Sequence, residues 1–134
     1  MYTFCTYCSA SKSHEEGEIS AIRRYQSLRI KTVHAAASSL GLGFHILSGE
    51  YGLLSPEHPI PWYDHLLRSE EVGQLVERVA EQIDECQISS LVYFTNSLAK
   101  EPTVVPYHNV IAAACSLTGR PFIVVEIDGE FLSD

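Results

Sequence analysis

The chain has 134 residues, 46% of them hydrophobic, which suits one globular domain with a core of normal size. Its 17 acidic and 9 basic side chains give a formal net charge of -8, which works against non-specific capture of a nucleic-acid backbone. No apolar run approaches the ~18–20 residues that span a bilayer, and no basic, apolar leader follows Met1, so we expect a cytoplasmic protein.

In the first half of the chain, two predicted strands flank a long predicted helix. Residues 2–9 form an apolar, β-rich run that ends in a polar loop. From about residue 19 to residue 40, apolar side chains recur at helical spacing, and Gly41 and Gly43 supply the stop. Residues 44–48 follow as a second buried strand.

The second half of the chain continues the alternation of helices and strands. Ser69 is a favourable N-cap for a helix with one apolar face. Residues 90–95 are predicted to form a third buried strand. Pro106 opens a further helix, which Gly119 ends, and residues 122–127 form the fourth strand.

This order of elements predicts an α/β fold. Buried strands that alternate with helices indicate a parallel sheet, covered on both faces through right-handed crossovers. We therefore expect a three-layer α/β/α sandwich around a mainly parallel four-stranded sheet, in one domain over residues 1–134. Ligands of such folds bind beyond the carboxyl ends of the strands. The segments expected at that rim are residues 8–14, 48–64, 96–108 and 126–128.

The four cysteines are too few and too scattered for a disulfide framework, so we expect reduced thiols. Cys5 and Cys8 form a Cys-x-x-Cys motif, but their odd offset in an extended strand points them to opposite faces. A zinc site would also need two further ligands, and the six histidines show no paired spacing for them. We therefore predict neither a bound metal nor another cofactor.

The segment from residue 48 to residue 64, "SGEYGLLSPEHPIPWYD", is far longer than an ordinary βα loop of about 2–6 residues. It contains two Gly-linked turns, several prolines and the aromatic pair Trp62 and Tyr63. Since this loop follows a buried strand, we expect it to form most of the wall of a pocket at the rim. Its glycines would permit simple turns, or would let backbone N–H groups approach an anion or a base edge.

This segment resembles the pattern Ser-x-x-Tyr-Gly-Leu-Leu, followed by Pro-x-Tyr-Asp, of a bacterial and phage domain family of unknown function. Upstream, "CSASKS" and "RRYQSL" are similar to that family's Cys-Ser-x-x-Lys and Tyr-x-Ser segments. A related stretch occurs in the YaaA-type peroxide-stress proteins. The resemblance covers the first half of the chain, and it implies a uracil-DNA-glycosylase-like fold, as in the core of archaeosine synthases, which process bases in nucleic acids.

The resemblance carries over only to positions that match the family's motifs. Glu50 stands where relatives carry other residue types, so it is not expected to be catalytic. The YaaA-type proteins lack an equivalent of Asp64, which argues against a mechanism shared with them. The matching positions are Ser9, Lys12, Tyr25, Ser27, Ser48, Tyr51, Gly52, Leu53, Tyr63 and Asp64.

Asp64 is the candidate catalytic residue. A carboxylate beside Trp62 and Tyr63 would be partly desolvated, which raises its pKa and suits it to act as a general base. Alternatively, Asp64 caps or turns the chain before His65. Lys12 would recognise a phosphate or a carbonyl group, or it is an ordinary solvated loop residue.

The remaining candidates would bind the ligand. An aromatic side chain of the long loop would stack on a base, and Asn96 would read the edge of that base. Tyr107 and His108 would reach the rim, or they are ordinary residues at the start of a helix. The predicted ligand-binding residues are Ser9, Lys12, Ser48, Tyr51, Gly52, Trp62, Tyr63 and Asn96.

These features favour an enzyme that breaks or exchanges a glycosidic bond of a nucleobase, nucleoside or nucleotide ligand. Two other classes stay open, namely a nucleotide or nucleic-acid binding module without chemistry, and an interaction domain in which Trp62 forms part of a partner surface. The expected partner is a small nucleobase-containing ligand or a single flipped nucleotide, without binding of an extended duplex or a membrane.

Overall fold

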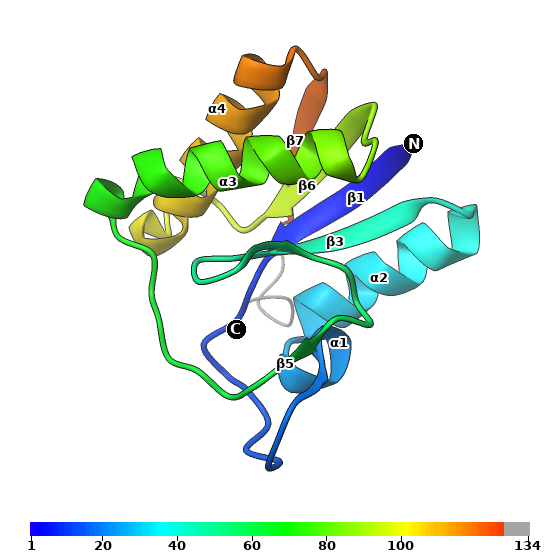
Figure 1. Cartoon of the computed structure of the whole chain (residues 1–134), viewed down its shortest axis with the longest axis vertical. Helices are drawn as coiled ribbons and strands as arrows, with labels where there is room; N and C mark the ends of the chain where they lie inside the picture. The colour runs from blue at the N-terminus through cyan, green and yellow to red at the C-terminus, as the bar shows by residue number, and fades with distance from the viewer. Residues whose placement is uncertain (128–134) are drawn as a thin grey trace.

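A five-stranded sheet forms the centre of the computed structural model, which describes residues 1–127 (Figure 1). Strand β1 pairs in parallel with β3 on one side and β6 on the other, and β6 pairs in parallel with β7. Strand β4 pairs antiparallel with β3 at the edge. Across the sheet, the order is β4 (Gly52–Leu54), β3 (Gly43–Ser48), β1 (Tyr2–Tyr7), β6 (Ser90–Thr95) and β7 (Phe122–Glu126).

The α/β class and the parallel pairing of the four predicted strands are confirmed. The expectation of a four-stranded sheet is wrong, because part of the long loop folds back on β3 as the fifth strand. Gly52 permits this reversal, since its φ of 75° lies in the left-handed region that favours glycine. Leu54 then pairs with Ile46, and Gly52 with Ser48, so the sheet is mixed at this edge.

The helix predicted over residues 19–40 is divided into three parts. Residues Ile19–Ser20 form strand β2, Ala21–Arg24 form the single turn α1, and Leu28–Leu40 form α2. Between the helices Tyr25 is extended, with φ -80° and ψ 123°. Ser27 caps α2, because its side-chain oxygen accepts a hydrogen bond from the Ile30 N–H at 3.2 Å.

The other predicted helices are present with shifted starts. Helix α3 covers Val72–Glu85 and follows a 3-10 turn over Ser69–Glu71, so Ser69 does not cap it. Helix α4 covers Val105–Thr118 and follows a 3-10 turn over Pro102–Val104. Helices α2 and α4 end as predicted, at glycines in the left-handed conformation, Gly41 and Gly119.

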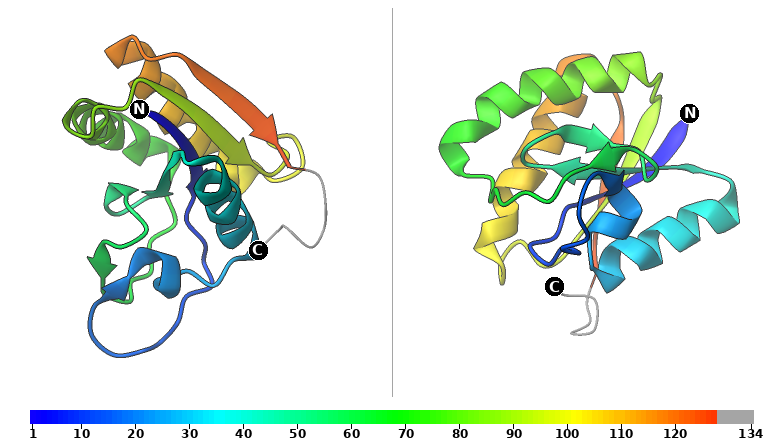
Figure 2. Two further views of the ribbon diagram at one scale, coloured as in Figure 1. Left: turned by 90° about the vertical axis from the view of Figure 1, so that its right-hand side faces the viewer. Right: turned by 60° about the horizontal axis from the view of Figure 1, so that its bottom comes forward.

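Helices lie on both faces of the sheet (Figure 2). Helix α2 packs on the face that carries Phe44, whose ring centroid lies 4.9 Å from that of His34. Helix α4 packs on the opposite face, where the ring centroid of Tyr107 lies 5.8 Å from that of Tyr7. Helix α3 packs on α4 and on β4. No helix within residues 1–127 has both the length and the apolar character needed to cross a bilayer.

A small second sheet lies beyond the ends at which β1 and β3 stop (Figure 1), where β2 pairs antiparallel with β5 (Pro59–Ile60). Arg24 holds this part together from inside, because its side chain is fully buried. Its guanidinium donates hydrogen bonds to backbone carbonyls, at 2.8 Å to Ser13, 2.9 Å to Glu15, 2.5 Å to Gly17 and 3.0 Å to Ile60. The loop after β1 and the long loop are therefore fixed to each other.

We expect Gly52→Ala to lower the free energy of unfolding by about 2–4 kcal/mol. The new Cβ would collide with Oε1 of Gln82, and the left-handed φ would add strain. Gln82 cannot move away freely, because it accepts a hydrogen bond from the Leu53 N–H at 2.7 Å and donates to the Tyr51 carbonyl at 3.3 Å. Denaturant titration measures the loss.

The matched control is Gly73→Ala in the first turn of α3, where an added Cβ meets no heavy atom within 4 Å. Alanine is the better helix former, so this variant should gain up to about 1 kcal/mol. Equal stabilities of the two variants would contradict the role assigned to Gly52.

Candidate functional site

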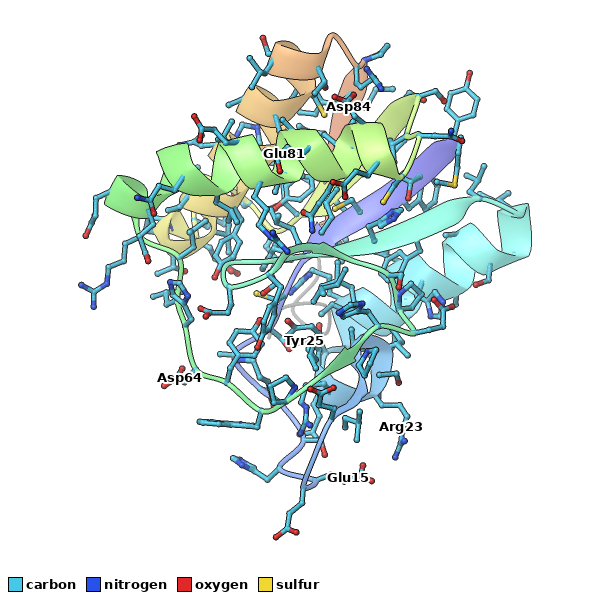
Figure 3. All side chains as sticks on the ribbon, in the orientation of Figure 1. Glu15, Arg23, Tyr25, Asp64, Glu81 and Asp84 are labelled. Atoms are coloured by element: carbon cyan, nitrogen blue, oxygen red, sulfur yellow. The ribbon has the colours of Figure 1, made fainter. Side chains whose placement is uncertain are left out.

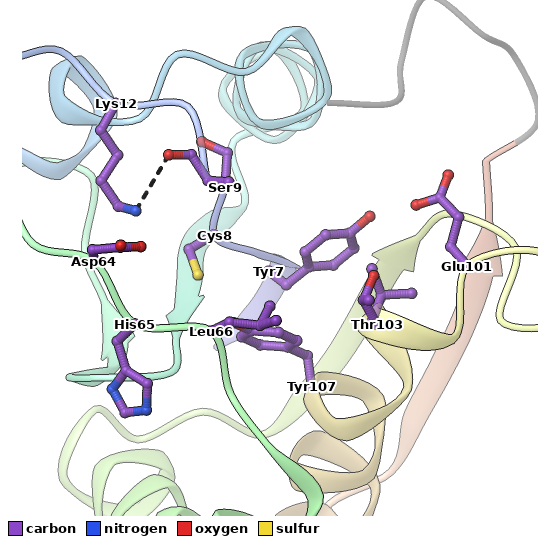
Figure 4. Close-up of a pocket in the computed structure, with 12 residues that line it drawn as sticks. Tyr7, Cys8, Ser9, Lys12, Asp64, His65, Leu66, Glu101, Thr103 and Tyr107 are labelled. Atoms are coloured by element: carbon purple, nitrogen blue, oxygen red, sulfur yellow. Dashed lines mark hydrogen bonds between the residues drawn. The ribbon is translucent and has the colours of Figure 1, made fainter.

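A pocket with a volume of about 130 Å³ opens at the carboxyl end of β1 (Figure 4). Three segments line it, namely the stretch from Tyr7 to Lys12, the loop residues 64–66, and the segment from Glu101 to Tyr107, which includes the 3-10 turn before α4 and the first residues of α4. Three of the four predicted rim segments thus contribute to one pocket. The expectation that the long loop forms most of its wall is wrong, because of residues 48–64 only Asp64 lines the pocket, and much of the loop pairs instead as β4 and β5. The fourth rim segment, residues 126–128, does not line the pocket at Glu126, and Asp128 lies outside the described residues.

Lys12 is the main polar group of the pocket wall. Its side chain is buried, with 7% exposed, yet none of the ion pairs within the described part of the chain includes it. The ammonium reaches the Ala10 carbonyl at 3.5 Å, a long hydrogen bond, and lies 4.6 Å from the ring centroid of Tyr63 and 5.9 Å from that of Tyr25. These ring faces offset part of the cost of burying the charge.

Hydrogen-bonded hydroxyl groups support Lys12 from behind. The Ser48 hydroxyl oxygen lies 2.8 Å from the Tyr63 hydroxyl, which in turn is hydrogen-bonded to the Tyr25 hydroxyl. Ser48 also accepts the backbone N–H groups of Glu50 and Tyr51, each at 3.1 Å. Burial raises the pKa of Tyr63 and of Tyr25, so both phenols stay neutral. This cluster fixes the Tyr63 ring against Lys12.

Asp64 lies at the mouth of the same pocket, and Figure 3 shows it on the outer side of the long loop. Its side chain is exposed, so the expected desolvation of this carboxylate is wrong. The neighbouring Trp62 does not cover it, because the Trp62 ring is 47% exposed and stacks on His14 at a centroid distance of 5.5 Å. Within residues 1–127 Asp64 makes no side-chain hydrogen bond, which gives no support to the capping alternative.

The other predicted ligand-binding residues fall into two groups. Ser9 lines the pocket, but its hydroxyl donates to the Ser11 carbonyl at 2.7 Å and thereby shapes the loop. Asn96 does not line the pocket, but its amide nitrogen is 3.4 Å from both carboxylate oxygens of Glu101, which does line it. Tyr51 and Gly52 are not at the pocket wall, and the Tyr51 ring packs edge-on against Tyr63.

Several site residues were missed by the sequence analysis. Glu101 and Tyr7 line the pocket, and Arg29 lies fully buried beside it, with its guanidinium carbon 3.6 Å from the centroid of the Tyr7 ring. Arg29 donates hydrogen bonds to the Thr6 hydroxyl and the Tyr7 carbonyl, each at 2.6 Å. The available signal was its position four residues before Val33, on the buried face of the predicted helix.

His65 links the long loop to the start of α3. Its Nδ1 lies 2.5 Å from the Glu50 carboxylate, and its Nε2 lies 2.8 Å from the Glu71 carboxylate. Glu71 also accepts the Arg68 N–H at 2.9 Å. The hydrogen bond to Glu50, followed by that to Glu71, raises the pKa of His65. These bonds fix the loop at residues 64–66, which form one wall of the pocket. Glu50 therefore has a partner in the structure that the sequence analysis did not foresee.

All four cysteines are free thiols. Cys5 and Cys115 are buried in the core, and burial raises the pKa of Cys115 to about 11 and that of Cys5 further. Cys8 lines the pocket. Within the part of the chain that the structure describes, no three His, Cys, Asp or Glu side chains gather as a metal site would require.

Comparisons with protein-family models, with curated proteins and with solved structures find no match to this chain. The geometry of the pocket is therefore the basis on which its function is inferred.

The His65 contacts predict a pH-dependent stability. A raised folded-state pKa means that the contribution of His65 is present in full below its ordinary pKa of about 6.5 and is lost as the pH rises through the raised value. Glu71 acts in the opposite direction, because the backbone hydrogen bond from Arg68 lowers its pKa, and its contribution is lost as the pH falls through that lowered value.

We therefore expect the melting temperature of the wild type to exceed that of His65→Gln by the largest margin near pH 6, between the pH at which Glu71 titrates and the pH at which His65 titrates. The difference should shrink at higher pH. Thermal unfolding across this pH range measures it. His58→Gln, at an exposed histidine of the same loop, is the control and should follow the wild type. A difference that stays constant with pH would refute the role of His65.

Proposed function

We propose that the pocket binds a small nucleobase-containing ligand and that the protein breaks or exchanges its glycosidic bond. The observation that carries this proposal is the buried Lys12 ammonium, which faces a small cavity with an exposed carboxylate at its mouth. In this arrangement the Lys12 ammonium would hold one group of the ligand inside the pocket, and the Asp64 carboxylate would act on a bond outside it.

The size of the pocket limits what enters it. A volume of about 130 Å³ is well below the ~300–1,000 Å³ of sites that enclose a drug-sized ligand. One small group of the ligand would therefore enter, between Lys12 and the aromatic wall of Tyr7 and Tyr107. The rest of the ligand would extend past Asp64, which places the glycosidic bond at the mouth.

The exposure of Asp64 is compatible with hydrolysis, because the attacking water must reach the anomeric carbon. In the proposed step the Asp64 carboxylate accepts a proton from that water as the C–O bond forms. The C–N bond breaks, its electron pair goes to the base nitrogen, and this nitrogen then takes up the proton. The negative charge of Asp64 would also stabilise the oxocarbenium-like centre.

A second candidate function is ligand binding without chemistry. The observation that favours it is the lack of any hydrogen bond that would orient the Asp64 carboxylate within residues 1–127. The net charge of -8 favours a free small ligand or a single flipped nucleotide over an extended duplex in either case. An interaction domain built around Trp62 is the remaining alternative. For each of these functions we propose the cytoplasm as the compartment.

Asp64→Asn should abolish release of free base from nucleosides and nucleotides, as followed by chromatography, and leave ligand-induced thermal stabilisation in place. Because the side chain is exposed, the free energy of unfolding should change by less than about 0.5 kcal/mol. Glu81→Gln, at an exposed residue of α3 (Figure 3), is the matched control and should keep full activity.

Three results would count against the enzymatic proposal. Base release that survives in Asp64→Asn would remove its catalytic role. Stabilisation of the wild type by nucleosides or nucleotides without any turnover would favour the binding module. No stabilisation by either compound class would leave the interaction domain as the better reading.

A further inference from the structure

We infer that the group that enters the pocket is an oxyanion, a phosphate or a carboxylate, held by the Lys12 ammonium. The inference concerns the same pocket as the proposed function and narrows the ligand to an anionic one. The identification of the rest of the ligand as a nucleobase-containing molecule rests on the proposed function.

The charge of Lys12 is unbalanced within the described part of the chain. Burial of an ammonium group is unfavourable unless an opposite charge and good hydrogen bonds offset it. Lys12 is only 7% exposed, and the two acidic side chains that line the pocket, Asp64 and Glu101, form no ion pair with it. A negative group of the ligand would supply the missing charge.

Lys12 differs from Arg24, another buried cation of the same region, in the hydrogen bonds that it makes. Its guanidinium is surrounded by backbone carbonyls of Ser13, Glu15, Gly17 and Ile60, so its N–H groups are used within the fold. Lys12 has three N–H donors, and within residues 1–127 it makes one long hydrogen bond, at 3.5 Å to the Ala10 carbonyl. Contacts within the fold therefore account for the burial of Arg24. Those within the described residues leave N–H donors of Lys12 without an acceptor.

The remaining N–H donors of the Lys12 ammonium are available on the side of the pocket. The rings of Tyr63 and Tyr25 cover one side of the ammonium, and the Ala10 carbonyl lies on another. The remaining side belongs to the pocket wall, and Figure 4 shows the amino group turned toward the space beside Cys8 and Asp64. A compact ammonium with several free donors suits the oxygens of a phosphate or a carboxylate.

Glu101 confines the anion to one end of the pocket. It lies at the far side, next to Thr103, whereas Lys12 and Asp64 lie together on the opposite side (Figure 4). Glu101 would repel a negative group, so the oxyanion is expected at the Lys12 end of the pocket.

The test is thermal unfolding with inorganic phosphate and, separately, with acetate, against chloride at equal ionic strength. The variants are the wild type, Lys12→Met and the matched control Lys31→Met, which removes an exposed lysine of α2. We expect a saturable rise in melting temperature in the wild type and in Lys31→Met, and none in Lys12→Met. A rise with phosphate alone assigns a phosphate, and a rise with acetate alone assigns a carboxylate.

The melting temperature of the ligand-free variants provides an independent readout. Methionine keeps most of the side-chain volume and its contact with the Tyr63 ring but removes the unbalanced charge. Lys12→Met should therefore melt a few degrees above the wild type. A melting temperature several degrees below the wild type would make Lys12 a structural residue and would overturn the inference, as would the absence of a saturable rise with either anion.

Nucleosides and nucleoside monophosphates separate this inference from the proposed function. If inorganic phosphate acts through Lys12 but the monophosphates stabilise no more than phosphate does, the anion site stands and the nucleobase proposal fails. If uncharged nucleosides stabilise the wild type and Lys12→Met equally, the nucleobase proposal stands and the anion site is overturned.

Discussion

The hydrogen bonds between the hydroxyl groups of Ser48, Tyr63 and Tyr25 hold the pocket region together. These residues come from the end of β3, the end of the long loop and the link between α1 and α2. Ser48 and Tyr25 are fully buried and Tyr63 is half-buried, so the loss of one partner leaves a buried hydroxyl group unsatisfied. The cluster also sets the Tyr63 ring against Lys12, so the same interaction that closes the loop positions the ammonium of the pocket.

The parallel strands could be predicted from the sequence because each is a short apolar run buried in the core. The antiparallel strand β4 could not, because it depends on the left-handed backbone at Gly52 and on hydrogen bonds that Leu53 exchanges with Gln82 in a distant helix. The break before α2 was also missed, since the apolar spacing continues across it. There the extended Tyr25 and the carbonyl contacts of Arg24, which are long-range, override the local helical pattern.

The candidate site was predictable in part, because its position follows from the predicted order of the strands. The strand-end rule brought Lys12 and Asp64 to one pocket, although they are far apart in the sequence. It gave no information on side-chain direction, so the exposure of Asp64 and the outward stacking of Trp62 on His14 were not foreseen. The contacts of His65 depend on two carboxylates from separate segments, and no local pattern indicates such a pairing.

Lys12 is proposed to hold a negatively charged group of a small ligand in the pocket. The decisive experiment is a crystal structure of the protein soaked with a nucleoside 5′-monophosphate. We expect density for an oxyanion within hydrogen-bond distance of the Lys12 Nζ, with the sugar next to Asp64. Density for the nucleotide at another place on the surface, with the Lys12 ammonium paired to a carboxylate of the protein, would contradict it.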